Sequence, residues 1–285
     1  MNWQTRDIAP GLYLVATPLG NARDITLRGL DLLAGANVLA AEDTRSLRRL
    51  MDIHGIPVAD RPLIAYHDHN GDRARPRLLA ALDAGQSVVY ASEAGTPLIS
   101  DPGFDLMRAA LEAGYACTTA PGATAAVAAL TLSGLPSDRF MFAGFLPNSS
   151  GKRKKILAEC ADVPATLIFY ESPKRLGAML RDAAEVLGAD RAAVVCRELT
   201  KKFEERRAGS LAELSEVYLN QTPKGEIVVV IDRGAGRVMD QDSLDAALTD
   251  ALTRMSVKDA ASDIARRFGV PRRDAYQRAM ALGKN

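Results

Sequence analysis

The sequence has few of the features that mark a secreted or membrane protein. Its three cysteines, Cys117, Cys160 and Cys196, lie far apart, without CxxC spacing or a nearby histidine. This pattern predicts free thiols in a cytoplasmic protein, with neither disulfides nor a zinc site. The first residues show no apolar signal region. No window approaches the roughly 18 uninterrupted apolar residues of a membrane span. We therefore expect a cytoplasmic protein with no membrane partner.

An excess of charge of one sign is also missing. The 285 residues include 36 Lys and Arg against 35 Asp and Glu, a formal net charge of +1. The chain as a whole therefore does not attract nucleic acid, and any RNA binding must come from local basic patches. A hydrophobic content of 47% and a charged content of 25% are typical of a globular protein. The length allows two domains, each with its own core.

A glycine-rich dinucleotide fingerprint is missing after the first predicted strand. That strand, Gly11–Thr17, runs into Pro18–Leu19–Gly20–Asn21 instead of G-x-G-x-x-G. The chain nevertheless alternates strand and helix patterns, which predicts an α/β fold. The other strands predicted in the first domain are Asn37–Ala41, Leu63–His67, Ser87–Ala91, Ala116–Ala120 and Met141–Pro147.

The segment Ser92–Gly103 is the most informative stretch. It joins the apolar strand Ser87–Ala91 to a helical pattern and contains two glycines and two prolines. Gly95 permits a positive φ, whereas the prolines stiffen the loop. Because α/β proteins bind ligands at the carboxyl ends of their strands, this loop predicts a wall of backbone groups facing a polar small molecule. An ordinary connection between strand and helix is the alternative.

The second half of the chain predicts another α/β unit and a helical extension. We interpret Asn148–Gly151 as a linker, followed by the basic run Lys152–Lys155. In Ser256–Asn285, seven Lys and Arg against three Asp accompany a helix, turn, helix pattern. The predicted domains are an N-terminal α/β domain (1–147), a C-terminal α/β domain (148–234) and a helix-turn-helix-like extension (235–285). Strands predicted in the second domain are Ala165–Glu171, Arg191–Leu199, Phe203–Gly209 and Glu226–Asp232.

Six short motifs in this order resemble the tetrapyrrole methylase superfamily. Within it they are most similar to the small-subunit (16S) ribosomal RNA (cytidine-2′-O)-methyltransferases, which usually have Asp where this chain has Glu93. The resemblance implies two α/β domains with S-adenosylmethionine (SAM) in the cleft between them, and a homodimer. The motifs are Glu42–Arg45 (EDTR), Ser92–Gly103, Pro121–Thr124 (PGAT), Glu171–Pro173 (ESP), Arg197–Thr200 (RELT) and Lys224–Glu226 (KGE).

The resemblance also implies a set of SAM-binding residues. They are Leu19, Gly20, Ala94, Gly95, Thr96, Pro97, Ala123, Thr124, Phe169, Tyr170, Leu199, Gly225 and Glu226. Transfer to a ribose hydroxyl benefits from a positioned base. Carboxylates and a histidine at predicted strand ends are the candidates, in no order: Glu93, Glu198, Asp101 and His67, with Glu42 beside them. Each has a structural alternative, such as an ion pair or a loop hydrogen bond. His67, Asp68 and His69 offer too few ligands for a metal site, and none is expected.

Local basic clusters are the predicted RNA contacts, although most charged runs are simply solvated surfaces. The candidates are Lys152, Arg153, Lys154, Lys155, Lys201, Lys202, Arg272 and Arg273, with Arg206 and Arg207. We predict SAM-dependent 2′-O-methylation of a cytidine in the 16S RNA of the small ribosomal subunit. The alternatives are C-methylation of a tetrapyrrole precursor and a non-catalytic RNA-binding module. The basic run and the basic extension favour RNA, because a compact macrocycle needs neither.

Overall fold

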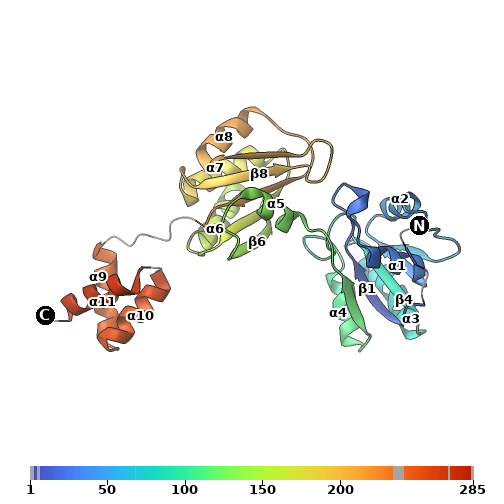
Figure 1. The fold of residues 1–285 in the computed structure, drawn as a ribbon, viewed down its shortest axis with the longest axis horizontal. Coiled ribbons are helices and arrows are strands. Elements are labelled where there is room, and N and C mark those ends of the chain that lie inside the picture. Colours follow the sequence, from blue (N-terminus) through green and yellow to red (C-terminus); the bar gives the residue numbers. More distant parts are fainter. Residues whose placement is uncertain (1–2, 5–6, 68, 234–240, 269, 284–285) are drawn as a thin grey trace.

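Two five-stranded sheets and a separate three-helix unit make up the protein (Figure 1). This computed structural model describes residues 3–4, 7–67, 69–233, 241–268 and 270–283. The first sheet has the strand order β3-β2-β4-β1-β5 and is parallel throughout. The second has the order β6-β7-β10-β8-β9. The predicted class, two α/β units followed by helices, is confirmed.

The first sheet is covered by helices on both faces, as its apolar strands require. β4 is buried along its whole length, between a core formed with α1 and α2 and another formed with α3 and α4. The strands are β1 (Gly11–Val15), β2 (Val38–Ala41), β3 (Leu63–Ala65), β4 (Ser87–Ala91) and β5 (Cys117–Ala120). The helices are α1 (Leu27–Gly35), α2 (Thr44–Ile53), α3 (Gly71–Asp83) and α4 (Phe104–Glu112), with a short 3-10 turn, η1 (Ala22–Asp24).

Parallel pairing fixes where the first domain can bind a ligand. β1, β2 and β4 are neighbours in the sheet, so the loops that follow them leave the same edge. Those loops contain Pro18–Asn21, Glu42–Asp43 and Ser92–Gly103, three of the stretches that the sequence singles out. Asp43 also caps α2, because its carboxylate accepts hydrogen bonds from the backbone N–H groups of Arg45 and Ser46.

The second sheet contains a strand that the sequence analysis assigned to the first domain. β6 pairs in parallel with β7, so the prediction that Met141–Pro147 ends the first domain was wrong. Its apolar residues are equally compatible with either sheet, because amino-acid composition does not indicate which strand it pairs with. The chain passes to the second sheet earlier, because α5 packs on β7, β8 and β10. The strands are β6 (Phe140–Phe145), β7 (Thr166–Glu171), β8 (Ala192–Arg197), β9 (Glu205–Ser210) and β10 (Ile227–Ile231).

The predicted linker is also wrong, since Asn148 and Ser149 only join β6 to the helix that covers the same sheet. α6, α7 and α8 pack on one face of the second sheet and α5 on the other. Arg153 is buried and donates from Nε to the Asp182 carboxylate at 2.8 Å. Truncating one partner of a buried ion pair typically costs about 3–5 kcal/mol. Arg153 therefore holds α6 to α7. The helices are α5 (Ala125–Ser133), α6 (Ser150–Ala161), α7 (Leu176–Leu187) and α8 (Leu211–Asn220).

The C-terminal helices form a small unit with its own apolar core. α9 (Gln241–Leu252), α10 (Val257–Phe268) and α11 (Arg272–Leu282) bury Leu248, Ile264 and Ala275 among other residues. α10 and α11 follow each other closely, as the helix, turn, helix pattern predicts; Gly269 of the turn lies outside the described residues. In the part of the chain that the structure describes, no helix is long and apolar enough to span a bilayer.

Candidate active site in the cleft between the sheets

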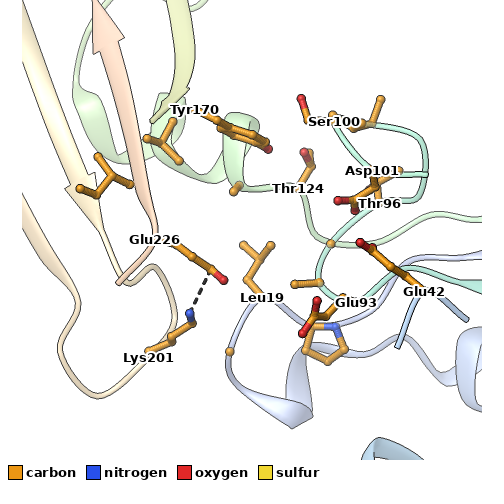
Figure 2. Close-up of a pocket in the computed structure, with 18 of the residues that line it drawn as sticks. Leu19, Glu42, Glu93, Thr96, Ser100, Asp101, Thr124, Tyr170, Lys201 and Glu226 are labelled. Carbon is orange, nitrogen blue, oxygen red and sulfur yellow. Dashed lines mark hydrogen bonds and ion pairs between the residues drawn. The ribbon is translucent and has the colours of Figure 1, made fainter. Parts of the chain in front are cut away.

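A cavity of about 670 Å³ lies between the two sheets and is lined from both. Figure 2 shows Glu42, Glu93 and Asp101 on one side of the opening and Tyr170, Lys201 and Glu226 on the other. Ligand pockets typically have volumes of about 300–1,000 Å³. The lining residues are Pro18, Leu19, Gly20, Glu42, Ser46, Arg49, Glu93, Ala94, Gly95, Thr96, Ile99, Ser100, Asp101, Thr124, Ala125, Phe145, Tyr170, Glu171, Lys201, Glu226, Ile227 and Val228.

The loop after β4 forms one wall of the cavity and is held in place by hydrogen bonds along its length. Thr17 and Gly95 exchange two backbone hydrogen bonds, of 2.9 and 3.0 Å. The Thr96 hydroxyl donates to the carbonyl of Ala123 at 2.9 Å, which ties the loop to the segment that enters the second domain. At its far end, the Tyr90 hydroxyl donates to the Pro102 carbonyl. The backbone wall predicted from the two glycines and two prolines is therefore held rigidly in place.

The same loop contains strained backbone. Leu98 and Ser100 have φ angles of 72° and 62°, in the left-handed region that side chains disfavour. Gly95 has a φ of 83°, and a Cβ atom there would lie 3.1 Å from Leu19 and 3.4 Å from the Ala123 carbonyl. Strain of this kind costs about 1–3 kcal/mol per residue and clusters at binding sites. It turns Ser100 and Asp101 toward the cavity, where both are lining residues.

The opposite wall is built on the ends of β7 and β10. The Tyr170 hydroxyl accepts a hydrogen bond from the backbone N–H of Ala126 at 3.1 Å, which joins β7 to the start of α5. The Glu198 carboxylate accepts hydrogen bonds from the Glu226 backbone N–H and from Lys201 Nζ, both at 3.0 Å. These bonds lower the pKa of Glu198. Gly225 leaves the space for this carboxylate, since a Cβ atom there would lie 2.4 Å from it.

The two walls meet at one end of the cleft. Lys201 Nζ donates to Glu226 at 2.9 Å (Figure 2), while its aliphatic stem crosses Gly20 of the first domain. A Cβ atom on Gly20 would come within 2.2 Å of Lys201 Cγ. The backbone N–H of Asn21 also donates to the Thr200 hydroxyl. Glycine at position 20 therefore leaves the space that the Lys201 side chain occupies.

Carboxylates dominate the cavity. Glu42, Glu93, Asp101, Glu171 and Glu226 line it, against two cationic side chains. Burial, reinforced by the charges of Glu42, Glu93 and Glu226, raises the pKa of Asp101 to about 7. A cationic ligand is favoured in such a site, and Asp101 can exchange a proton near neutral pH.

Eight of the thirteen predicted SAM-binding residues line this cavity: Leu19, Gly20, Ala94, Gly95, Thr96, Thr124, Tyr170 and Glu226. Pro97, Ala123, Leu199 and Gly225 are adjacent to it without lining it. Phe169 does not line it either, because its side chain is fully buried in the core on the α6–α8 face of the sheet. Successive strand residues point to opposite faces, so the side chain of Tyr170, and not that of Phe169, faces the cleft. Contact between SAM and the backbone of Phe169 stays a prediction.

Only some of the candidate bases lie in the cleft. Asp101, Glu93 and Glu42 line the cleft. Glu198 does not, and its carboxylate is held by Lys201 and the Glu226 backbone, which lowers its pKa and disfavours it as the base. His67 lines a neighbouring cavity of about 250 Å³, which Asp101 also borders. Within the described ranges, no three His, Cys, Asp or Glu side chains are grouped to hold a metal; Asp68 lies outside those ranges.

The predicted RNA contacts differ in how accessible they are. Arg153 is wrong, because it is buried in its pair with Asp182. Lys154 pairs with Glu185, and Lys201 closes the cleft. Arg206 donates to the carbonyls of Leu132 and Ser133 at the end of α5. Arg207, which pairs with Glu205, and Arg206 are exposed nonetheless. The other exposed residues are Lys152, Lys155, Lys202, Arg272 and Arg273, and for all seven RNA contact stays a prediction.

Several cavity residues were not singled out for the site in the sequence. Ser46 and Arg49 reach it from α2, Phe145 from the end of β6, and Ile227 and Val228 from β10. Arg49 could have been found from the sequence, because the helix α2 follows a strand of the parallel sheet and the charged side of this helix must face outward. No feature of the sequence indicates Phe145, because its strand, β6, was predicted to belong to the first domain.

The chain matches the family model described as Tetrapyrrole (Corrin/Porphyrin) Methylases over residues 11–215, and the model described as the RsmI C-terminal HTH domain over 238–283. It is 48% identical to the ribosomal RNA small subunit methyltransferase I of Mesorhizobium japonicum over 278 residues, covering 97% of this chain and 94% of that protein. It is 43% identical to the protein of the same name from Xylella fastidiosa, covering 94% and 98%.

Solved structures agree at the level of the fold. A uroporphyrin-III C-methyltransferase from Thermus thermophilus, complexed with S-adenyl homocysteine, matches with a TM-score of 0.55 and 21% identity, covering 77% of this chain and 96% of that one. A cobalt precorrin-4 methyltransferase matches with a TM-score of 0.59 and 17% identity, covering 78% and 94%. The chain therefore belongs to the tetrapyrrole methylase family of methyltransferases, and within it to the ribosomal RNA small subunit methyltransferase I group.

Proposed function

We propose that this protein transfers the methyl group of SAM to the 2′-hydroxyl of a cytidine in the 16S RNA of the small ribosomal subunit. The observation that carries the proposal is the acid-lined cleft between the two sheets, in a chain whose full-length relatives are named ribosomal RNA small subunit methyltransferases. The C-terminal unit has its own core, and its stretch Ser256–Asn285 is basic, which favours RNA over a tetrapyrrole as the acceptor.

The residues of the cleft fit SAM. Gly95 and Thr96 offer a wall of backbone close to the cavity, and Tyr170 with Ile227 offers an apolar surface opposite. The five carboxylates favour a ligand that carries positive charge. When bound, SAM supplies an electrophilic methyl group on a positively charged sulfur. The protein then has to align the acceptor oxygen with that methyl group and take up the hydroxyl proton.

Asp101 is the proposed proton acceptor. It combines a place in the cavity with a pKa raised to about 7, and a base works best when its pKa lies near the working pH. Glu42 and Glu93 keep that pKa high through their negative charges. In this proposal, the negative charges of Glu42 and Glu93 also attract the cationic donor.

Two further features belong to the proposal. We place the protein in the cytoplasm, where the small subunit is found. We also propose a homodimer, because β6 is an edge strand of the second sheet that leaves Phe140 and Met141 exposed. An exposed apolar edge of this kind is typical of a surface covered by another chain.

The direct test is methyl transfer from labelled SAM to isolated small ribosomal subunits, followed by digestion of the RNA to nucleosides. We expect the label in 2′-O-methylcytidine, with no transfer to a porphyrinogen. A label on the base, or on the porphyrinogen alone, contradicts the proposal. Binding of subunits without binding of SAM would instead indicate a non-catalytic RNA-binding module.

The contribution of Gly95 can be isolated with a matched glycine. Gly95 and Gly85 have φ angles of 83° and 71°, so alanine is strained at both positions. A Cβ atom at Gly85 has nothing within 4 Å, whereas one at Gly95 crowds Leu19 and the Ala123 carbonyl beside the cavity. We expect Gly95→Ala to weaken SAM binding about tenfold or more and Gly85→Ala to leave it unchanged. Calorimetric titration measures both, and equal affinities would remove Gly95 from the donor site.

The role of Asp101 predicts a pH dependence. An Asp must be ionised to accept a proton, so the wild-type transfer rate should rise with pH and level off above about 7. We expect Asp101→Asn to lower the single-turnover rate by about 10²–10⁴-fold and to abolish that rise. Glu93→Gln serves as the control: it should weaken SAM binding and retain the rise, moved to lower pH because the Glu93 charge no longer raises the pKa of Asp101. An Asp101→Asn enzyme with the wild-type profile would assign the proton to another group.

A further inference from the structure

We propose that two exposed arginines of α2, Arg49, which lines the cleft, and Arg48 next to it, bind phosphates of the acceptor RNA strand and so orient the target ribose toward Asp101. This inference rests on the proposed function and adds to it the side from which RNA enters. We call Arg48 and Arg49 the rim arginines.

Helical spacing places the rim arginines on the outer side of α2. Leu47 and Met51 are buried against the first sheet, whereas Arg45, Arg48 and Arg49 are exposed. Arg49 also lines the main cavity, where Ser46 is its neighbour from the same helix. One helix therefore presents positive charge both to the cavity and to the solvent just outside it.

The rim arginines, unlike several other cations of the chain, are not held by other residues that the structure describes. Arg45 is held by Asp43, Arg153 by Asp182 and Lys201 by Glu198 and Glu226. Neither Arg48 nor Arg49 forms an ion pair or hydrogen bond with the rest of the described chain. Their guanidinium groups are available to phosphate, which they can bind through two parallel hydrogen bonds.

The charges of the cleft explain why such a pair is needed. The carboxylates inside favour a cationic donor and repel the phosphates of RNA. An acceptor ribose can approach Asp101 only if the negative charge of its neighbouring phosphates is neutralised nearby. The rim arginines can do this, because Arg49 lines the cleft and Arg48 is exposed next to it. Ile99 and Phe145 also line the cavity and are 40% and 56% exposed. Apolar and aromatic surfaces of this kind can cover unstacked bases of single-stranded RNA.

The test compares subunit binding and SAM binding in the double variant Arg48→Gln/Arg49→Gln. Arg181→Gln is the matched control, because Arg181 is an exposed arginine on α7, which covers the outer face of the second sheet. We expect the double variant to bind isolated small subunits at least tenfold more weakly. Its salt dependence should flatten by about 0.7 per lost contact to a single strand. It should bind SAM at least as tightly as the wild type, because removing positive charge beside the carboxylates does not disfavour a cationic donor. This binding also shows that the variant is folded.

A double variant that keeps the positive charges tests whether charge alone explains the loss of binding. Arg48→Lys/Arg49→Lys should recover the salt dependence, since each phosphate contact keeps its cation. Wild-type affinity and salt dependence in the glutamine variant would overturn the inference, as would a matching loss of SAM affinity, which would assign the arginines to the donor. Failure of the proposed function is seen separately, because the wild-type protein would then transfer no methyl group to the subunit.

Discussion

The two hydrogen bonds between Thr17 and Gly95 are the constraint on which the rest of the site depends. They join the ends of β1 and β4 just beyond the parallel sheet, where no regular strand pairing remains. Once Gly95 is fixed, Thr96 reaches the Ala123 carbonyl, and the loop passes through the strained residues Leu98 and Ser100 to Asp101. The position of the proposed base is thus set by backbone bonds six residues away from it.

A second feature of the cleft is its separation of charge. The inner carboxylates suit a positively charged donor, and the exposed arginines of α2 suit a polyanionic acceptor. Burial, reinforced by three of these carboxylates, raises the pKa of Asp101 to about 7, so one set of charges can both attract the donor and help to tune the base. The second domain adds to the negative charge, since among the described residues its one cation in the cavity lining, Lys201, faces two carboxylates, Glu198 and Glu226.

Much of the fold and part of the site could be predicted from the sequence. The strands of the first sheet are short apolar runs, and the loop Ser92–Gly103 is marked by its glycines and prolines, so both were found. β6 was assigned to the wrong sheet because composition does not specify a pairing partner. Arg153 looked like one of four exposed cations, since nothing in a local sequence shows that Asp182 lies beside it. The pKa of Asp101 could not be predicted either, because the carboxylates that raise it come from distant elements.

The central claim is that the methyl donor binds between the two sheets, against Gly95 and Thr96 on one side and Tyr170 and Ile227 on the other. A crystal structure of the protein with S-adenosylhomocysteine, the product left after transfer, tests it most directly. The account predicts the ligand in the 670 Å³ cleft, within contact distance of both walls. A ligand bound elsewhere, such as the groove of Lys258, Arg272 and Tyr276 on the C-terminal helices, would contradict it.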